Sequence, residues 1–281
     1  MQKRSRRVSV LRMREDSTAP SPASGGGLGW GPPESTASDL VAVEEPLEIR
    51  LGNAPLAVTM RTPGDDEDLV RGFAITEGIV LDPSELASVQ QIDESHVSLL
   101  LRDGVEVDAG RFQRNMFLTS SCGVCGKASI EAVRLFARPA RPFTVRGEVV
   151  AALTQRLREA QPTFDETGGL HAAGLFDLDG ARIVVREDVG RHNAVDKVVC
   201  AASRLGWPLA PGLLVVSGRQ SFEIVQKAAM AGIGGIVGVS APSSLAVDLA
   251  AELGMLLAGF ARDGGFNVYA GAEHLEGTPA R

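Results

Sequence analysis

The sequence predicts an α/β protein in which a smaller N-terminal α+β domain precedes a C-terminal α/β domain. Between residues 193 and 260, short all-apolar segments alternate with longer segments of helical periodicity, which is typical of a largely parallel sheet covered by helices. Earlier in the chain, alternating apolar and polar residues flank glycine turns, as in β-hairpins. The expected division is a disordered arm (1–40), a small α+β domain (41–118), an α/β domain (119–272) and a tail (273–281).

Composition excludes several classes of protein. The chain has 281 residues, of which 44% are hydrophobic and 22% charged, so it can bury a sizeable core. A net charge of −7 argues against nucleic acid as the main partner, and no segment has the apolar length of a membrane span. Three cysteines are too few for a secreted disulfide framework. We therefore expect a cytoplasmic protein that binds neither nucleic acid nor membrane.

The arm is predicted from its composition. Pro20, Pro22 and a glycine-rich stretch follow a basic start, and such segments bury too little apolar surface to fold. Arg6 and Arg7 resemble the start of an export signal, but charged residues stand where that signal needs an apolar run. We expect a solvated tail without a signal peptide.

In the N-terminal domain the pattern predicts a hairpin, a helix and a second hairpin. Residues 48–51 and 56–60 alternate around a Gly-Asn turn. The acidic residues 65–68 should begin a helix, because the positive end of the helix dipole favours negative charge there. Residues 97–101 and 105–108 flank an Asp-Gly turn and are expected to pair.

The C-terminal domain should contain a helix over residues 148–160 and a hairpin of residues 170–177 and 181–186. Helices and apolar strands then alternate. The expected helices span residues 193–205, 221–231 and 244–253, and the expected strands span residues 213–216, 236–239 and 255–260.

A C-x-x-C motif, Cys122 and Cys125, stands just before a helical segment over residues 128–137. The free N–H groups of a first helical turn, with Lys127 nearby, favour a thiolate. Redox exchange, metal binding and sulfur transfer can each use such a thiolate, so the motif alone does not choose among them.

Structural zinc is one use of such a motif, and the ligand count argues against it. A closed zinc site needs four ligands, and the chain has no second C-x-x-C. Cys200 lies in an apolar helical segment and is predicted to be a core residue. His171 and His192 could complete a site, but no spacing requires it. We predict no permanently bound metal.

Deamination and dithiol exchange also use a C-x-x-C. A zinc nucleobase deaminase needs a Glu two residues after its upstream His, whereas Ser98 follows His96, and Ser121 stands where Pro would precede Cys122. A thioredoxin-like motif would follow the first strand of a short domain, but here a whole α+β unit comes first. Glycines on both sides of Val124 indicate a flexible loop. Sulfur transfer is favoured, and dithiol exchange stays open.

Polar loops follow the predicted strands at residues 217–221, 240–244 and 260–265. Ligands of open α/β sheets bind beyond the carboxyl ends of the strands. We therefore expect these loops to share one edge of the sheet, called the rim below, and residues 186–193 to join them there.

The composition of the rim suits phosphate. Any one loop could be a simple turn with Ser221 or Ser244 as a helix N-cap. Several loops together, however, bring glycines, hydroxyls and arginines to one edge, and helix N-termini with guanidinium groups bind phosphate well. Arg191, Arg219 and Arg262 are the candidate phosphate contacts.

Several motifs together resemble one known family, the formate dehydrogenase accessory sulfurtransferases (FdhD family). The resemblance runs from about residue 41 to 269 without a departure at the motif positions. It rests on the segments Glu44-Glu45-Pro46-Leu47, Met60-Arg61-Thr62-Pro63-Gly64, Ser120-Ser121-Cys122-Gly123-Val124-Cys125-Gly126-Lys127, Thr167-Gly168-Gly169-Leu170-His171-Ala172-Ala173, Glu187-Asp188-Val189-Gly190-Arg191-His192-Asn193-Ala194-Val195-Asp196-Lys197 and Ser240-Ala241-Pro242-Ser243-Ser244-Leu245-Ala246.

The resemblance implies a sulfur carrier in molybdenum cofactor maturation. A cysteine desulfurase would load a persulfide onto Cys122, and Cys125 would assist or resolve it. The sulfur would pass to the metal of bis-molybdopterin guanine dinucleotide, the form that formate dehydrogenase needs. The family's cofactor-binding stretch corresponds to Phe260, Ala261, Arg262, Asp263, Gly264 and Gly265, and we add Arg219, Ser240 and His192 of the rim as candidate contacts.

The family also implies a homodimer whose C-terminal domain resembles the cytidine deaminase scaffold. A second hypothesis stays open beside sulfur transfer. In it, the protein is a noncatalytic chaperone for the molybdenum cofactor, and its C-x-x-C serves only redox chemistry or zinc binding.

Overall fold

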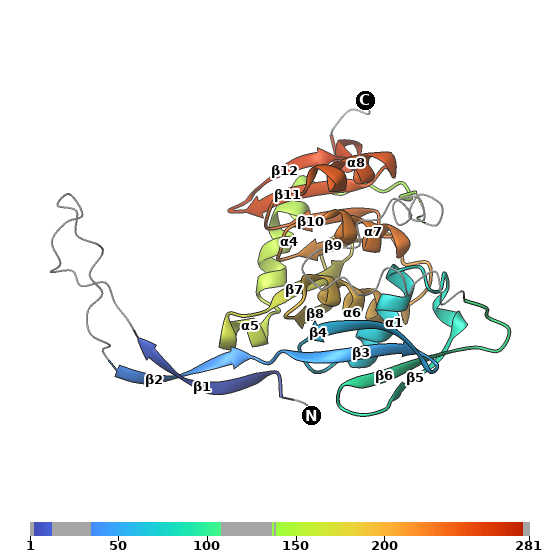
Figure 1. Ribbon diagram of the computed structural model, residues 1–281. Coiled ribbons are helices and arrows are strands. Elements are labelled where there is room, and N and C mark those ends of the chain that lie inside the picture. The colour runs from blue at the N-terminus through green and yellow to red at the C-terminus, as the bar shows by residue number, and fades with distance from the viewer. Residues whose placement is uncertain (1–2, 13–34, 108–136, 138, 278–281) are drawn as a thin grey trace.

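The computed structural model describes residues 3–12, 35–107, 137 and 139–277, which form a mixed α/β protein with three sheets (Figure 1). A two-stranded ribbon lies nearest the N-terminus, and a four-stranded and a six-stranded sheet follow along the chain. The helices that bind the two larger sheets together are α1, α6 and α7.

The four-stranded sheet has the order β4-β3-β6-β5. β3 (Glu45–Leu51) and β4 (Ala54–Arg61) form the predicted first hairpin, and α1 (Asp66–Thr76) begins within the acidic run as predicted. β6 (His96–Leu101) lies parallel to β3 and antiparallel to β5 (Leu86–Gln91), which follows a short 3₁₀ helix, η2 (Pro83–Glu85).

The second predicted hairpin is wrong. β6 pairs back with β5, and residues 105–107 form no strand. The reason lies in the sequence of β5, Leu86-Ala87-Ser88-Val89-Gln90-Gln91, which is half polar and has a single buried residue, Leu86. An edge strand of this kind lacks the apolar alternation on which the prediction depended.

The expectation of a disordered arm over residues 1–40 is also wrong where the structure describes it. β1 (Ser5–Arg12) and β2 (Ser35–Ala42) pair as an antiparallel ribbon that extends from the body before β3 (Figure 1). The Arg4 guanidinium lies 2.5 Å from the Asp65 carboxylate and fixes the base of the ribbon. The period-two pattern around Val8 and Val10 indicates a strand. The prediction of disorder used the composition of the whole arm instead. Residues 13–34 lie outside the described residues.

The six-stranded sheet has the order β12-β11-β10-β9-β7-β8. β9 (Leu213–Val216), β10 (Gly235–Gly238) and β11 (Leu256–Arg262) are parallel, as predicted. The predicted hairpin of β7 (His171–Phe176) and β8 (Arg182–Asp188) is confirmed and joins the sheet antiparallel to β9.

The sheet is less parallel than expected because its other edge is also antiparallel. β12 (Gly265–Ala270) folds back on β11, and the short η3 (Ala272–His274) follows it. The sequence of β12 alternates between exposed and half-buried residues, so it lacks the pattern of the buried apolar strands. The strand expected over residues 255–260 is β11, which ends two residues later, at Arg262.

Helices cover both faces of the six-stranded sheet. α4 (Gly147–Arg158) packs on one face against Leu213 and Val215 of β9, and the alternate residues Leu214 and Val216 point to the other face. There they meet α6 (Arg191–Ser203), α7 (Phe222–Met230) and α8 (Ser244–Glu252). Because side chains alternate along β9, the strand contributes residues to two separate cores, one on each face of the sheet.

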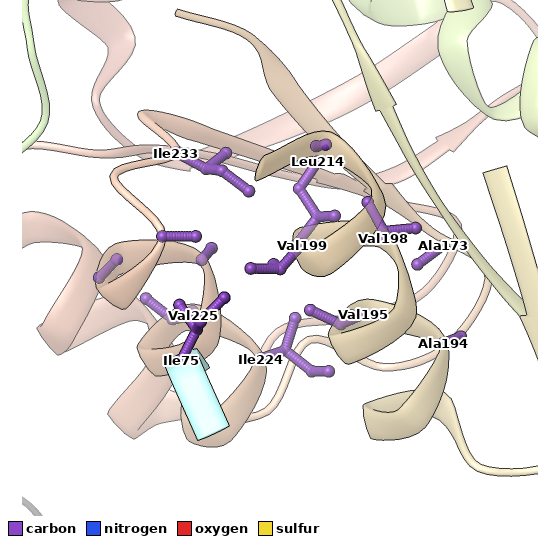
Figure 2. Packing of buried hydrophobic residues seen from close by; sticks show 14 of the residues in the cluster. Ile75, Ala173, Ala194, Val195, Val198, Val199, Leu214, Ile224, Val225 and Ile233 are labelled. Atoms are coloured by element: carbon purple, nitrogen blue, oxygen red, sulfur yellow. The ribbon is translucent and has the colours of Figure 1, made fainter. Parts of the chain in front are cut away.

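The larger core continues into the N-terminal part of the chain. Figure 2 shows Ile75 of α1 beside Val195 and Val199 of α6 and Val225 of α7. Leu47 and other buried residues of the four-stranded sheet belong to the same cluster. The expected small domain therefore does not have a core of its own.

Candidate functional site

The predicted rim exists, and backbone contacts join its loops. The Gln220 side chain donates from Nε2 to the carbonyl oxygens of Ser240 (3.2 Å) and Ala258 (3.1 Å). The Gln220 backbone exchanges hydrogen bonds with Ala241 and Ser243, and the Phe260 N–H donates to the Ser240 carbonyl at 3.2 Å. Residues 217–221, 240–244 and 260–265 therefore meet at one edge of the sheet.

The segment Phe260–Gly265 differs from a simple strand-exit loop, because it comprises the end of β11, a two-residue turn and the start of β12. Phe260, Asp263 and Gly264 have left-handed backbone with φ of 51°, 53° and 77°. Arg262 and Asp263 are exposed. Ala261 is fully buried, and its carbonyl accepts a hydrogen bond from Thr154 Oγ1 at 2.7 Å, so this residue fixes the turn to α4.

Residues 186–193 join the rim as predicted. His171, at the start of β7, pairs with Asp188 at the end of β8. Its Nδ1 lies 3.4 Å from Ser217 Oγ, and His192 Nε2 lies 3.4 Å from Ser221 Oγ. A Cβ on Gly218 would lie 3.3 Å from His171 Nδ1 and 3.6 Å from Arg191 Cδ, so glycine lets these side chains approach the loop.

Burial and positive neighbours keep the two imidazoles neutral. Burial, assisted by the charges of Lys227 and Arg191, lowers the pKa of His192 to about 3. Burial and Arg191 also lower the pKa of His171. Each ring therefore offers one donor and one acceptor at neutral pH.

Arg191 carries a buried donor at the rim that has no partner among the described residues. Its Nε is buried, and none of the described residues accepts a hydrogen bond from it. An unsatisfied buried donor is costly, and an anionic group placed between the rim loops would satisfy it. Arg219 and Arg262 are exposed and can add charge from outside.

Two helices present open N-termini at the same edge. α6 begins after Gly190 and α7 after Ser221, and neither has a side-chain cap hydrogen bond. By contrast, Ser243 caps α8 by accepting from the Ala246 N–H. The first-turn N–H groups of α6 and α7 thus add to the positive potential of the rim.

Other residues of the segment 187–197 stabilise the fold and do not face the rim. Asp188 and Lys197 form a buried ion pair of 2.7 Å. Asp188 also accepts hydrogen bonds from the backbone N–H of Thr62 and Gly190 and from the Asn193 amide. These contacts fix the end of β4 to the start of α6, and they leave Asp188 no role at the rim surface.

A second buried network involves Asp196, the residue of α6 directly before Lys197. Lys227 Nζ contacts Asp196 Oδ1 (2.9 Å), Glu77 Oε1 (2.6 Å) and Thr76 Oγ1 (3.0 Å). Burial raises the pKa of Asp196 to about 6, while the two carboxylates, acting against burial, raise the pKa of Lys227. We regard the group as ionised at neutral pH, since the ammonium is certain to be charged and contacts both Asp196 oxygens. It ties α1, α6 and α7 together behind the rim.

The cysteines of the C-x-x-C, Cys122 and Cys125, lie outside the described residues. Cys200 is buried in α6, and burial raises the pKa of its thiol to about 12, so it is a core residue as predicted. Within the described ranges, no group of three or more His, Cys, Asp or Glu side chains could hold a metal. No helix in that part of the chain is long and apolar enough to cross a membrane.

A pocket of about 440 Å³ opens beside the rim, on the α4 face of the sheet. Sequence reasoning missed it, since its walls come from α4, from α5 (Pro162–Thr167) and from the loop before β7. The glycine pair in the segment Thr167–Ala173 was the only sequence signal near it. The lining residues are Thr154, Leu157, Arg158, Gln161, Phe164, Gly168, Gly169, Leu170, His171, Val189, Ser217 and Val239.

The fold is that of a mixed α/β protein, and the strand ends of its larger sheet gather neutral imidazoles, open helix N-termini and an unpaired guanidinium N–H, groups that suit anions. The model of the FdhD/NarQ family matches residues 42–276. The chain therefore belongs to the FdhD/NarQ family, as its motifs indicated.

Similar proteins agree with this assignment. The chain is 51% identical to "Sulfur carrier protein FdhD" of Streptomyces coelicolor, over 86% of this chain and 90% of the relative. It is 46% identical to the protein of the same name from Mycobacterium tuberculosis, over 85% and 93%. A crystal structure from Desulfotalea psychrophila, described as a formate dehydrogenase accessory protein, shares the fold with a TM-score of 0.69 at 23% identity, over 95% of this chain and 99% of that one.

Proposed function

We propose that the protein is a sulfur carrier that serves formate dehydrogenase. It accepts sulfur from a cysteine desulfurase as a persulfide on Cys122 and passes it to the molybdenum of bis-molybdopterin guanine dinucleotide, which is its substrate. The name of the similar proteins, sulfur carrier protein FdhD, supports the first half. The single structural observation that supports the second half is the anion-binding character of the rim.

The rim suits the phosphates of the acceptor. Arg191 offers an unpaired buried Nε, and α6 and α7 offer uncapped N-termini. Arg219 and Arg262 provide exposed guanidinium groups, which bind phosphate in a bidentate manner. Ser240 has its carbonyl engaged by Gln220, so only its hydroxyl and N–H remain for a ligand. His192 would contribute a neutral ring.

The sulfur step is a thiolate exchange. The Cys122 thiolate attacks the terminal sulfur of the donor persulfide, a new S–S bond forms on Cys122, and the donor cysteine leaves as a thiolate. Cys125 would then attack the inner sulfur of Cys122, which forms a Cys122–Cys125 disulfide and releases sulfide to the metal. A cellular dithiol would reduce that disulfide before the next cycle.

We further propose that the protein works in the cytoplasm as a homodimer and that residues 119–272 share the cytidine deaminase scaffold without its chemistry. His96, the histidine nearest upstream of the cysteines, lies on β6 of the N-terminal sheet beside Asp93. It is therefore held by a different sheet from the one that carries the rim, which supports the absence of a deaminase centre.

Mass spectrometry tests the carrier role directly. The purified chain is incubated with a cysteine desulfurase and cysteine, and the peptide that contains Cys122 is expected to gain one sulfur atom. Cys200→Ala is the matched control, because it removes a buried thiol and should leave the modification unchanged. A Cys122 peptide that stays unmodified would exclude the carrier role.

A cell-based assay separates the carrier from the chaperone hypothesis. Cys122→Ala should abolish formate dehydrogenase activity in cells, since it removes the thiolate that accepts the sulfur. Full activity in that variant would favour a noncatalytic cofactor chaperone. Zinc at one equivalent in the purified protein would instead support a metal role for the C-x-x-C.

A further inference from the structure

We propose that His274 is a positioning residue that closes a proton-dependent clasp between the C-terminal end of the fold and residues 139–146. Residues 139–146 follow the C-x-x-C in the chain and lead into α4. The clasp consists of the His274 side chain and the backbone carbonyls of Phe143 and Gly254. It is complete when both imidazole nitrogens carry a proton, and it loses one hydrogen bond when the ring is neutral. The inference uses no residue of the rim and does not depend on the proposed function.

The two ring nitrogens of His274 face two backbone carbonyls. Nδ1 lies 3.0 Å from the Phe143 carbonyl oxygen, and Nε2 lies 2.8 Å from the Gly254 carbonyl oxygen. A carbonyl oxygen can only accept a hydrogen bond, whereas a neutral imidazole has a single N–H. A neutral ring can therefore donate to one carbonyl and must turn a lone pair toward the other. Only the doubly protonated ring donates to both.

The position of the ring leaves it little freedom to avoid these carbonyls. The His274 residue is 7% exposed. Its ring stacks on the Phe143 ring with the centroids 4.1 Å apart and the planes within 7° of each other. An aromatic face attracts a cation, so this stack stays favourable when the imidazole is charged. Proton loss therefore acts on the two hydrogen bonds and does not remove the packing.

Close backbone approaches hold both sides of the ring. A Cβ on Gly234 would lie 2.8 Å from Phe143 Cε1, so the glycine lets Phe143 pack against the start of β10. Gly271 has a left-handed φ of 69°, and a Cβ there would lie 2.4 Å from the Met255 carbonyl oxygen. This second glycine lets η3 turn tightly against the start of β11. The two fits place the His274 ring between Phe143 and Gly254.

Backbone hydrogen bonds join the same segments beside the ring. The Val145 N–H donates to the His274 carbonyl at 2.8 Å, and the Glu276 N–H donates to the Val145 carbonyl at 3.0 Å. Val145 and Leu275 form a short parallel bridge. A pairing of this length has little stability of its own. We therefore expect the contacts of the His274 ring to decide how long the pairing stays closed.

Other charged groups on the packed elements do not titrate in the same range. Arginine stays charged and exposed carboxylates stay ionised between about pH 5 and 8, whereas histidine is the side chain that ordinarily changes charge there. Arg141 donates to the Leu209 carbonyl, and Arg146 lies 3.5 Å from Glu148. The charged side chains of residues 139–146, of α8 near Gly254 and of the C-terminal segment are Arg141, Arg146, Glu252, Glu273 and Glu276.

Amide hydrogen exchange of the full chain tests the clasp. The measured quantity is the protection of the Val145 and Glu276 amides relative to the Val215 amide of β9, which removes changes in global stability. This ratio should be at least tenfold higher at pH 5.5 than at pH 8, because only the doubly protonated ring holds both carbonyls. His274→Gln carries an amide that can donate to one carbonyl at a time, so its ratio should be low at both pH values.

His96→Gln is the matched control, because it removes a histidine of the other sheet and should leave the wild-type ratio unchanged at each pH. Nitrogen-15 NMR of the wild-type rings gives a readout that a merely structural role would not change. Both His274 nitrogens should carry protons at pH 5.5, and the loss of one proton should occur at the same pH as the fall in the ratio.

A ratio that does not change with pH would overturn the proposal, and so would a proton loss at a different pH from the fall in protection. The same pH dependence in His274→Gln as in the wild type would also overturn it. Circular dichroism checks that the variant is folded. If it is not folded, the comparison of NMR with exchange in the wild type decides.

Discussion

Lys197 shows how one side chain can hold two parts of the chain together. It is 1% exposed, pairs with the fully buried Asp188, and donates to the Thr62 carbonyl at 3.1 Å. Removing one partner of a buried ion pair leaves the other charge without compensation. We predict that Lys197→Met lowers the free energy of unfolding by about 3–5 kcal/mol, measured by urea denaturation at pH 7.

Arg71→Met is the matched control for that substitution. Arg71 pairs with Glu67 at 2.8 Å on the exposed side of α1, and pairs of this kind contribute about 0–1 kcal/mol. A loss for Lys197→Met no larger than the loss for Arg71→Met would contradict the role given to the buried pair.

His192 should make stability depend on pH. Its pKa is lowered from 6.5 to about 3 in the folded protein, so the unfolded chain binds the proton first. The contribution of the neutral ring is complete above pH 6.5 and is lost as the pH falls toward 3. We predict that the wild type loses stability more steeply than His192→Gln between pH 6.5 and 4, in urea titrations at fixed ionic strength. Parallel curves would show that His192 is not the group responsible.

The sequence identified residues 187–197 as one motif, but it could not predict which of their side chains lie at the rim and which are buried. Arg191 and His192 lie at the rim, while Asp188 and Lys197 are buried against Thr62, more than a hundred residues earlier in the chain. Which charged residue is buried depends on that distant contact, and no local pattern reports it. The pocket beside the rim was missed for the same reason, since its walls come from elements that meet only after folding.

Among the elements, α1 and α6 cross at a glycine. A Cβ built on Gly72 would lie 1.8 Å from the Asp196 carbonyl oxygen, so an alanine there must push the helices apart. We predict that Gly72→Ala lowers the free energy of unfolding by about 3 kcal/mol, the upper end for overpacked sites, despite the better helix propensity of alanine.

Gly147→Ala serves as the comparison, because Gly147 is also helical and its nearest neighbour would be Phe266 Cζ at 3.9 Å. Its effect should be near zero or stabilising by up to about 1 kcal/mol. Thermal unfolding of the two variants decides the matter, and equal midpoints would contradict a close helix crossing at Gly72.

The elements that could be predicted are those whose own sequence shows, by its pattern of apolar residues, which positions are buried. β9 and β10 are buried along their whole length and appear as apolar runs, and α1 and α4 carry clear amphipathic patterns. β5 and β12 lie at sheet edges and present mixed surfaces, while the pairing of β1 with β2 crosses residues 13–34. Edge strands and long-range pairings depend on partners that a local window does not contain.

The whole molecule has a core that spans both larger sheets, with α1, α6 and α7 at its centre. We predict that the described body opens as one unit, because neither sheet can lose its partner without exposing this cluster. Native-state hydrogen exchange should give the slowest amides of α1 and β9 the same opening free energy. A markedly lower value for α1 would indicate an independent N-terminal domain, as the sequence alone suggested.

Residues 187–197 include both buried residues and rim residues, and mutations in the two groups should give different phenotypes. Asp188 and Lys197 support the fold, whereas Arg191 lies at the rim, where we propose that the ligand binds. Alleles that damage the buried pair should behave as temperature-sensitive, with activity restored when cells grow cool enough for the weakened protein to accumulate. Alleles at Arg191 should be defective at every growth temperature, with normal protein abundance. A selection for formate dehydrogenase activity, repeated at two growth temperatures, would distinguish the buried residues of this segment from the rim residue Arg191.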